Sequence, residues 1–319
     1  MVFLIFIFGL LGLWMGAELV IKGALGVAKR LGLSETFVGV TIVALGTDLP
    51  EVIVSLAGAF EQRVGIETSG LVIGNIIGST MGQISLVLGI AGLLRVLEIK
   101  KNEIITNGSV MIASVLAFWL FAQDGFISPT DGLMLLVGYG LYLFGSALNE
   151  RKLTRLAKKM TKKKLKKDRS PMWWFAVQLV VGLALVAGAS HLVIKQGLVM
   201  AELLNVSQTL VGILMIGLGT SLPELVVSVN AILRGSAGLS VGNLIGSNIV
   251  DILLALGLSS LIGGWRVNAN VSTFDLPFLL VTSIAVLLFL LSRKKLERKE
   301  SFLILALYYG YIILKLQGF

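Results

Sequence analysis

The sequence predicts an all-α integral membrane protein with ten transmembrane helices, arranged as two inverted five-helix repeats with broken helices at the midplane. Three observations lead to this prediction. The 319 residues are 56% hydrophobic and only 14% charged, whereas soluble domains have about 45–50% apolar and about 25% charged residues. Apolar stretches long enough to cross a bilayer, about 20 residues, recur along the whole chain. The two halves of the chain also match each other in sequence.

Ten apolar stretches are the candidate spans. The first has no basic leader and matches an interior segment, so we interpret it as a helix and not as a removed signal peptide. The absence of cysteine excludes disulfides and thiolate metal sites. The stretches cover residues 3–28, 37–60, 70–94, 104–122, 131–148, 172–200, 209–233, 239–263, 272–292 and 301–317.

The net charge of +9 is interpreted as a topology signal, because the basic residues are concentrated in alternate loops. Residues 151–169 alone contain eleven Lys and Arg. The positive-inside rule places this segment in the cytoplasm and both termini on the extracellular or periplasmic side. We interpret it as a solvated loop, with contact to anionic lipids as the alternative. The expected partner is therefore the lipid bilayer, with no nucleic acid and no obligate protein partner.

An internal repeat divides the chain. Residues 16–51 align without gaps on 189–224, and residues 71–89 align on 239–257. Because each half has an odd number of spans, the second half enters the membrane from the opposite side. Inverted repeats are typical of transporters, which bind substrate near the midplane where broken helices meet. The predicted parts are an N-terminal half (1–150), a basic cytoplasmic linker (151–171) and a C-terminal half (172–319).

Two motifs interrupt the apolar spans in both halves. The first is "GTDLPE" in one half and "GTSLPE" in the other, and the second is "GNIIGS" and "GNLIGS". Glycines and the prolines Pro50 and Pro223 weaken a helix, so both motifs are predicted to break one. Asp48 and Ser221 are then placed to cap the restarted helices. Broken backbone inside a membrane requires protein partners or an ion-binding cavity.

Four acidic residues lie well inside the spans, at these interruptions. Ionisable groups at that depth usually face the interior and mark an ion path. The two symmetric glutamates, Glu51 and Glu224, would form a hard anionic oxygen cage, which suits Ca²⁺ better than Mg²⁺. The four residues are Asp48, Glu51, Glu224 and Asp251.

The second motif adds polar residues to the same region. Ser79 and Gln83 are four residues apart, as are Ser247 and Asp251, so each pair shares a helix face. The amides of Asn75 and Asn243 are interpreted as partners for carbonyls of the broken helices. Outside these motifs, the pairs Glu18 and Lys22, and His191 and Lys195, are interpreted as structural, through pairing and snorkelling.

With these duplicated motifs, the chain resembles the calcium/cation antiporter superfamily and, within it, the sodium/calcium exchangers. The resemblance covers the whole chain, with alpha repeats at 38–94 and 211–263. It implies that the first and sixth helices slide as a gating pair. It also implies Ca²⁺ ligation by Glu51 and Glu224 with the backbone of Thr47 and Thr220, Na⁺ ligation by Ser79 and Ser247 with the backbone of Ala44 and Gly217, and a central site formed by Gln83, Asp251, Asp48 and Ser221.

The expected function is therefore a secondary antiporter of a prokaryotic cytoplasmic (inner) membrane that exports Ca²⁺ in exchange for Na⁺, with no enzymatic activity and no cofactor. Asp48 stands where serine is common in the family, and Gln83 where asparagine is common. Because Asp48 adds a fourth carboxylate, coupling to H⁺ or dependence on K⁺ stays an alternative, with Asp48 and Asp251 as the residues concerned. More distant alternatives are a cation channel and an intramembrane aspartyl protease with Asp48 and Asp251 as its dyad, although a protease would leave the duplicated glutamates unexplained.

Overall fold

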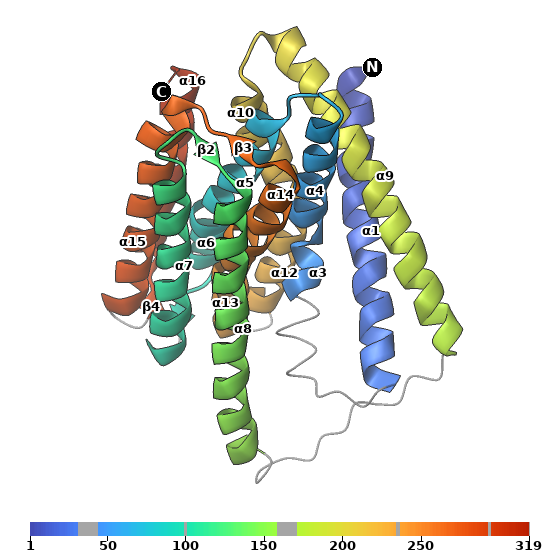
Figure 1. Ribbon diagram of the computed structural model, residues 1–319. Helices are drawn as coiled ribbons and strands as arrows, with labels where there is room; N and C mark the ends of the chain where they lie inside the picture. Colours follow the sequence, from blue (N-terminus) through green and yellow to red (C-terminus); the bar gives the residue numbers. More distant parts are fainter. Residues whose placement is uncertain (31–43, 99–100, 158–170, 234–236, 293–294, 319) are drawn as a thin grey trace.

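Helices form nearly all of the described chain and run side by side in one bundle (Figure 1). The structure is a computed structural model, and it describes residues 1–30, 44–98, 101–157, 171–233, 237–292 and 295–318. The predicted linker lies outside the described residues except at its ends, and so do the first six residues of the predicted alpha repeat 38–94.

The N-terminal part alternates long helices with short breaks, and η marks a π-helical segment. In chain order its elements are α1 (Val2–Arg30), α3 (Ala44–Thr47), α4 (Leu49–Arg63), α5 (Ser69–Met81), η2 (Gly82–Val87), α6 (Leu88–Leu94), β1 (Leu97–Glu98), α7 (Lys101–Phe121), β2 (Phe126–Ile127) and α8 (Pro129–Ala157).

The C-terminal part follows a similar order. Its elements are α9 (Met172–Leu204), α10 (Gln208–Val211), η3 (Gly212–Gly217), α11 (Leu218–Thr220), α12 (Leu222–Leu233), α13 (Ala237–Ile249), η4 (Val250–Leu256), α14 (Gly257–Gly263), β3 (Trp265–Arg266), η5 (Val271–Asp275), α15 (Leu276–Ser292), β4 (Lys295–Leu296) and α16 (Arg298–Leu316).

Six helical stretches of the described chain are long and apolar enough to cross a membrane, and a seventh qualifies if a bent pair counts as one span. That pair joins 208–220 to 222–229 with a bend of 41°. α4, which carries the first "LPE" motif, has only 15 residues and is too short to qualify by itself. The all-helical membrane fold is confirmed, and the count of ten spans stays a prediction.

The "GT-x-LPE" motif interrupts a helix in both halves, as predicted. Each break is a single residue, Asp48 between α3 and α4 and Ser221 between α11 and α12. The predicted side-chain cap at Asp48 is wrong, because its carboxylate makes no capping hydrogen bond. Its backbone stays near the helical region, with φ −78° and ψ 0°, and Val52 N still donates to Asp48 O at 3.2 Å.

The predicted break at "GN-x-IGS" is also wrong. α5 and α13 continue through residues 74–79 and 242–247 without interruption. The glycines of the first copy serve close packing: a Cβ added at Gly74 would collide with Thr209 O, and one added at Gly78 with Ile213 O. The irregularity comes one turn later, where each helix widens into a π-helical segment, η2 or η4. Such segments are frequent at functional sites.

α1 and α9 pack along each other and lie at one edge of the bundle (Figure 1). Glycines of α1 allow the close approach. Gly9 and Gly12 lie against Val193 and Ala189, where an added Cβ would come within 2.9 Å of either side chain. Such small-residue contacts are typical of helix pairs in membranes.

Two short antiparallel sheets mark opposite ends of the bundle (Figure 1). β1 pairs with β4, and β2 pairs with β3. α4 ends beside the β2/β3 sheet, where Gln62 Nε2 donates to Gly264 O at 3.2 Å and Arg63 Nε donates to Ile262 O at 2.9 Å. α12 runs the other way, and α13, which follows it, contacts β1. The helices that carry the two "LPE" motifs therefore point toward opposite ends.

Candidate ion-binding site

The four acidic residues of the motifs are all completely buried. Asp48 lies in the break before α4, Glu51 and Glu224 lie in the first turns of α4 and α12, and Asp251 lies in η4. Six of their eight carboxylate oxygens have no hydrogen-bond partner within the described part of the chain. Burying an unpaired carboxylate is very costly, so this arrangement favours cations as the missing partners.

The four carboxylates neighbour one another and the predicted polar residues. The Asp48 carboxylate adjoins Ser247 and Glu224, and the carboxylates of Glu51 and Asp251 lie near enough to interact electrostatically with Glu224. The hydroxyl of Ser247 is fully buried and has no partner among the described residues. The fourth acid, Asp48, therefore faces the same space as the acids predicted to bind Ca²⁺.

Four side-chain hydrogen bonds join residues of the two halves across this region. They run from Ser79 Oγ to Asp251 Oδ2 (2.7 Å), from Ser221 Oγ to Glu51 Oε1 (3.2 Å), from Thr220 Oγ1 to Asn75 Oδ1 (3.1 Å) and from Asn248 Nδ2 to Gln83 Oε1 (3.1 Å). The predicted site residues are thus brought together at the contact between the halves.

The remaining predicted site residues lie in the short helical elements on either side of the two breaks. Ala44 and Thr47 begin and end α3, and Gly217 ends η3 immediately before α11. Pro50 and Pro223 are buried in the first turns of α4 and α12, where their missing amides cost no helical hydrogen bond. The residues that are predicted to contribute backbone carbonyls therefore lie next to the helix breaks.

The two asparagines do not play the predicted role. The Nδ2 atoms of Asn75 and Asn243 have no partner in the described residues, so neither amide satisfies a carbonyl of a broken helix there. Backbone hydrogen bonds persist at each break, from Val52 N to Asp48 O and from Leu225 N to Ser221 O. Asn75 instead accepts a hydrogen bond from Thr220. Asn243 is half-buried, and no hydrogen bond described in the structure joins it to the carboxylates.

The donor set is one of oxygens. Within the described chain, no group of three His, Asp or Glu side chains is arranged to hold a metal ion by itself. Ca²⁺ takes six to eight oxygens in flexible geometry, and Na⁺ is likewise an oxygen-seeking cation. A cation at this place would therefore need hydroxyl, amide and carbonyl oxygens in addition to the carboxylates.

Asn248 is a site residue that the sequence reasoning missed. It is fully buried, donates to Gln83 Oε1 and to Leu244 O (2.7 Å), and so fixes the amide orientation of Gln83. The alignment of the halves matches it with Thr80, a smaller residue whose hydroxyl donates to Ile76 O of its own helix. The sequence signal that could have identified Asn248 is the difference between "GST" in the first copy of the motif and "GSN" in the second.

The predicted pairing of Glu18 with Lys22 is confirmed. Lys22 Nζ lies 2.7 Å from Glu18 Oε1 on an exposed face of α1. His191 does not pair on its own helix; its Nδ1 lies 2.7 Å from Glu61 Oε1. The reason is tertiary: α9 packs against α4 and brings the imidazole within reach of a carboxylate on the neighbouring helix.

A fifth buried acid lies apart from the motifs. Asp275 at the end of η5 is fully buried and accepts a bond from Tyr311 OH at 2.8 Å. Lys315 Nζ lies 2.6 Å from its other oxygen. Because a cation of the protein already pairs with it, Asp275 is a structural group and not a free ligand.

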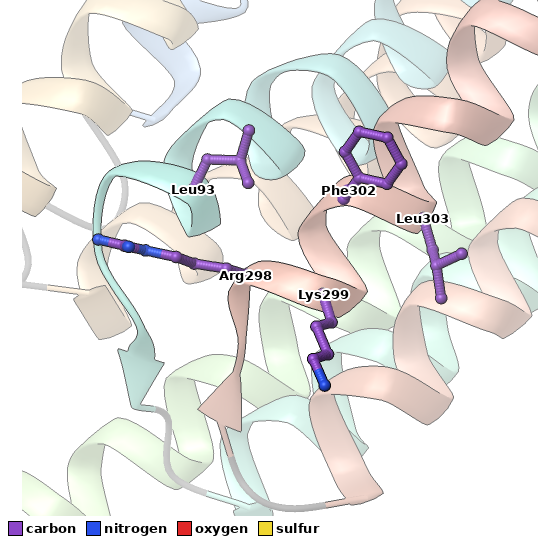
Figure 2. Close-up of a pocket in the computed structure, with 5 residues that line it drawn as sticks. All are labelled: Leu93, Arg298, Lys299, Phe302 and Leu303. Carbon is purple, nitrogen blue, oxygen red and sulfur yellow. The ribbon is translucent and has the colours of Figure 1, made fainter.

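The surface groove shown in Figure 2 is distinct from these carboxylates. It lies between α6 and α16 and contains no predicted site residue. Arg298 and Lys299 extend from the first turn of α16 beside the apolar side chains. Its lining residues are Leu93, Arg298, Lys299, Phe302 and Leu303.

Comparisons with known proteins agree with the geometry. The family model described as "Sodium/calcium exchanger protein" matches residues 1–148 and 174–317. The putative antiporter CaxA of Alkalimonas amylolytica is 32% identical over 95% of both chains. The sodium/calcium exchanger MaX1 of Methanosarcina acetivorans is 29% identical over 98% of this chain and 97% of its own. A solved structure of the sodium-calcium exchanger NCX_Mj is 31% identical and superposes with a TM-score of 0.66, covering 98% of this chain and 99% of the other.

Proposed function

Because the chain belongs to the sodium/calcium exchanger family, we propose that it is a secondary active antiporter that exports Ca²⁺ in exchange for Na⁺ by alternating access. The observation that carries the proposal is the set of four buried carboxylates, contributed by both halves, with six oxygens unpartnered in the described chain. A doubly charged cation offsets part of this charge, and Na⁺ ions compete for the same oxygens. The proposed location is the cytoplasmic membrane of a prokaryote.

The proposed architecture is the inverted repeat of two five-helix halves, 1–150 and 172–319. The sequence alignment of the halves supports it, and so do the opposite directions of α4 and α12 (Figure 1). The N and C termini lie toward the same end of the bundle, as an even number of crossings requires (Figure 1). The basic segment 151–169 favours placing that end outside the cell.

The proposed ion ligands are the residues gathered at the two breaks. Glu51 and Glu224 would bind Ca²⁺, and the other polar groups would bind Na⁺ or complete the calcium shell. Alternating access is proposed to come from movement of α1 and α9 as one unit, which their glycine contacts support. The full set of proposed ligands is Glu51, Glu224, Thr47, Thr220, Asp48, Ser221, Ser79, Ser247, Asp251, Gln83, Ala44 and Gly217.

Ion flux in purified protein tests this function. Proteoliposomes loaded with Na⁺ and diluted into Na⁺-free buffer, with pH and K⁺ equal on both sides, are expected to take up radioactive Ca²⁺. The uptake should stop when choline replaces internal Na⁺. Uptake that requires a proton gradient or K⁺ would instead establish one of the alternative couplings. Downhill Ca²⁺ flux without any counter-ion would identify a channel.

Asp48→Ser tests the role of the fourth carboxylate. Since Asp48 makes no capping bond and adjoins Glu224, we expect the variant to keep Na⁺-driven uptake but to bind Ca²⁺ about tenfold more weakly, equivalent to about 1.4 kcal/mol. Calcium titration by calorimetry and the uptake assay provide the two measurements. Asp48→Asn controls for side-chain volume and should behave similarly. Unchanged affinity in both variants would remove Asp48 from the proposed ligands.

A further inference from the structure

Buried hydroxyls in the helices of this chain usually bond to the carbonyl three or four residues earlier. Thr80, Ser114 and Ser283 follow this pattern, with donor-acceptor distances of 2.6 to 2.7 Å. Five buried hydroxyls of the described chain depart from it by having no partner at all, those of Ser240, Ser247 and Thr282 and those of Ser55 in α4 and Ser228 in α12, which lie on the helices of the acids. Ser55 and Ser228 are both fully buried. A buried polar group without a partner is costly, and each such case calls for an explanation.

The two serines occupy equivalent places in the halves. Ser55 is four residues after Glu51, and Ser228 is four residues after Glu224, with the same offset of 173 that aligns the motifs. Residues four apart lie on one helix face, about 6 Å apart along the axis. Each hydroxyl is therefore one turn beyond a carboxylate, on the face that the carboxylate occupies.

The directions of the helices place the serines on opposite sides of the carboxylates. α4 runs from its break toward the β2/β3 sheet, which its terminal side chains contact. α12 runs toward the end marked by β1 and β4 (Figure 1). One buried hydroxyl thus lies between the acids and each end of the bundle.

Further unpartnered polar atoms accompany Ser228. On α13, which packs against α12, the buried Oγ of Ser240 and the Nδ2 of Asn243 also lack partners among the described residues. Polar atoms left unbonded between the acids and one end are typical of a route for a partly hydrated ion, because only a transient partner satisfies them. A hydroxyl oxygen is a hard ligand that suits Na⁺ and Ca²⁺.

We propose that Ser55 and Ser228 are transit ligands, which bind the transported cation between the carboxylates and the β2/β3 end or the β1/β4 end, respectively. The inference rests on the proposed exchange function. It adds two ion-binding residues and assigns each of them to ions that enter or leave at one end of the bundle. Each hydroxyl replaces one water of the cation as it approaches or leaves the acids from its own end. Loss of one hydroxyl should therefore weaken ion capture from one side only.

Sided exchange kinetics test the proposal in the full-length protein. Vesicles with the protein in one known orientation allow the calcium KM to be measured separately from each face. We expect Ser55→Ala to raise the KM about tenfold, equivalent to about 1.4 kcal/mol, at the face of the β2/β3 sheet, and to leave the opposite face within about twofold. Ser228→Ala should do the reverse. Ser55→Thr and Ser228→Thr retain the hydroxyl and should restore the wild-type KM.

Ser114→Ala is the matched control, because Ser114 is a buried helix serine whose Oγ donates to Met111 O at 2.7 Å. Alanine variants at 55 and 228 that match this control at both faces overturn the inference, as does a change that is equal at both faces. These results leave the exchange function intact. Wild-type vesicles that show no Na⁺-dependent Ca²⁺ flux would overturn the proposed function itself, and the inference with it.

Discussion

Glu51→Gln is expected to abolish Na⁺-driven Ca²⁺ uptake and to weaken Ca²⁺ binding at least about 100-fold, equivalent to about 2.7 kcal/mol. Glutamine keeps the size of the side chain but removes a charge from a fully buried site. The loss is large because no bulk water is available to replace the carboxylate as a ligand. Glu224→Gln should have an effect of similar size, since both oxygens of Glu224 lack partners in the described chain.

Calcium titration of the purified variants and uptake into proteoliposomes measure the two effects. Glu202→Gln is the control, because Glu202 is an exposed acid near the end of α9 and is expected to leave both quantities unchanged. Near-normal affinity and flux in Glu51→Gln would show that the transported cation binds elsewhere. An effect confined to one of the two glutamates would contradict a shared cage.

Asp275→Asn is expected to lower the free energy of unfolding by about 3–5 kcal/mol, the usual cost of breaking a buried ion pair from one side. The Lys315 side chain is only 6% exposed, so its charge would stay buried without its counter-ion. Asp275 also holds Tyr311 OH, which ties η5 to α16. Thermal unfolding of the purified protein in detergent, followed by fluorescence, measures the loss.

Two further variants separate charge pairing from general damage. Glu18→Gln breaks the pair with Lys22, whose side chain is 56% exposed, and should cost less than about 1 kcal/mol. Asp275→Asn combined with Lys315→Met removes both charges and should recover most of the lost stability. If Asp275→Asn is no more harmful than Glu18→Gln, the buried pair does not stabilise the fold. If the double variant is no more stable than the single one, the damage does not come from the unpaired lysine.

Local sequence predicted which residues form the candidate site because the chemistry is unusual there. An acidic side chain in an apolar span costs free energy in any packing arrangement of the helices. Four acids could therefore be identified without knowing their neighbours: Asp48, Glu51, Glu224 and Asp251. The duplication of "GT-x-LPE" also located both helix breaks, because proline and glycine act on the backbone of their own turn. These inferences depend on short-range effects only.

Asp275 shows where such reasoning fails. It stands near the start of an apolar span and looks like a residue at the membrane boundary. Its burial and its pairing with Lys315 depend on how η5 packs against α16, 40 positions later in the chain. The contact of His191 with Glu61 is of the same kind. In both cases the partner is far away in sequence, and no periodicity within one helix indicates it.

The sequence by itself determined the membrane class, the duplicated motifs, the acids and the two breaks, because composition, repetition and backbone chemistry are properties of single segments. Only the tertiary structure decided that α5 and α13 continue through their glycines, that Asn248 holds Gln83, and that Asp48 faces Glu224 instead of capping its helix. The physical reason is that each of these outcomes depends on which surfaces the two halves place in contact. The free energy of such a contact belongs to two distant segments together, so it cannot be inferred from either segment alone.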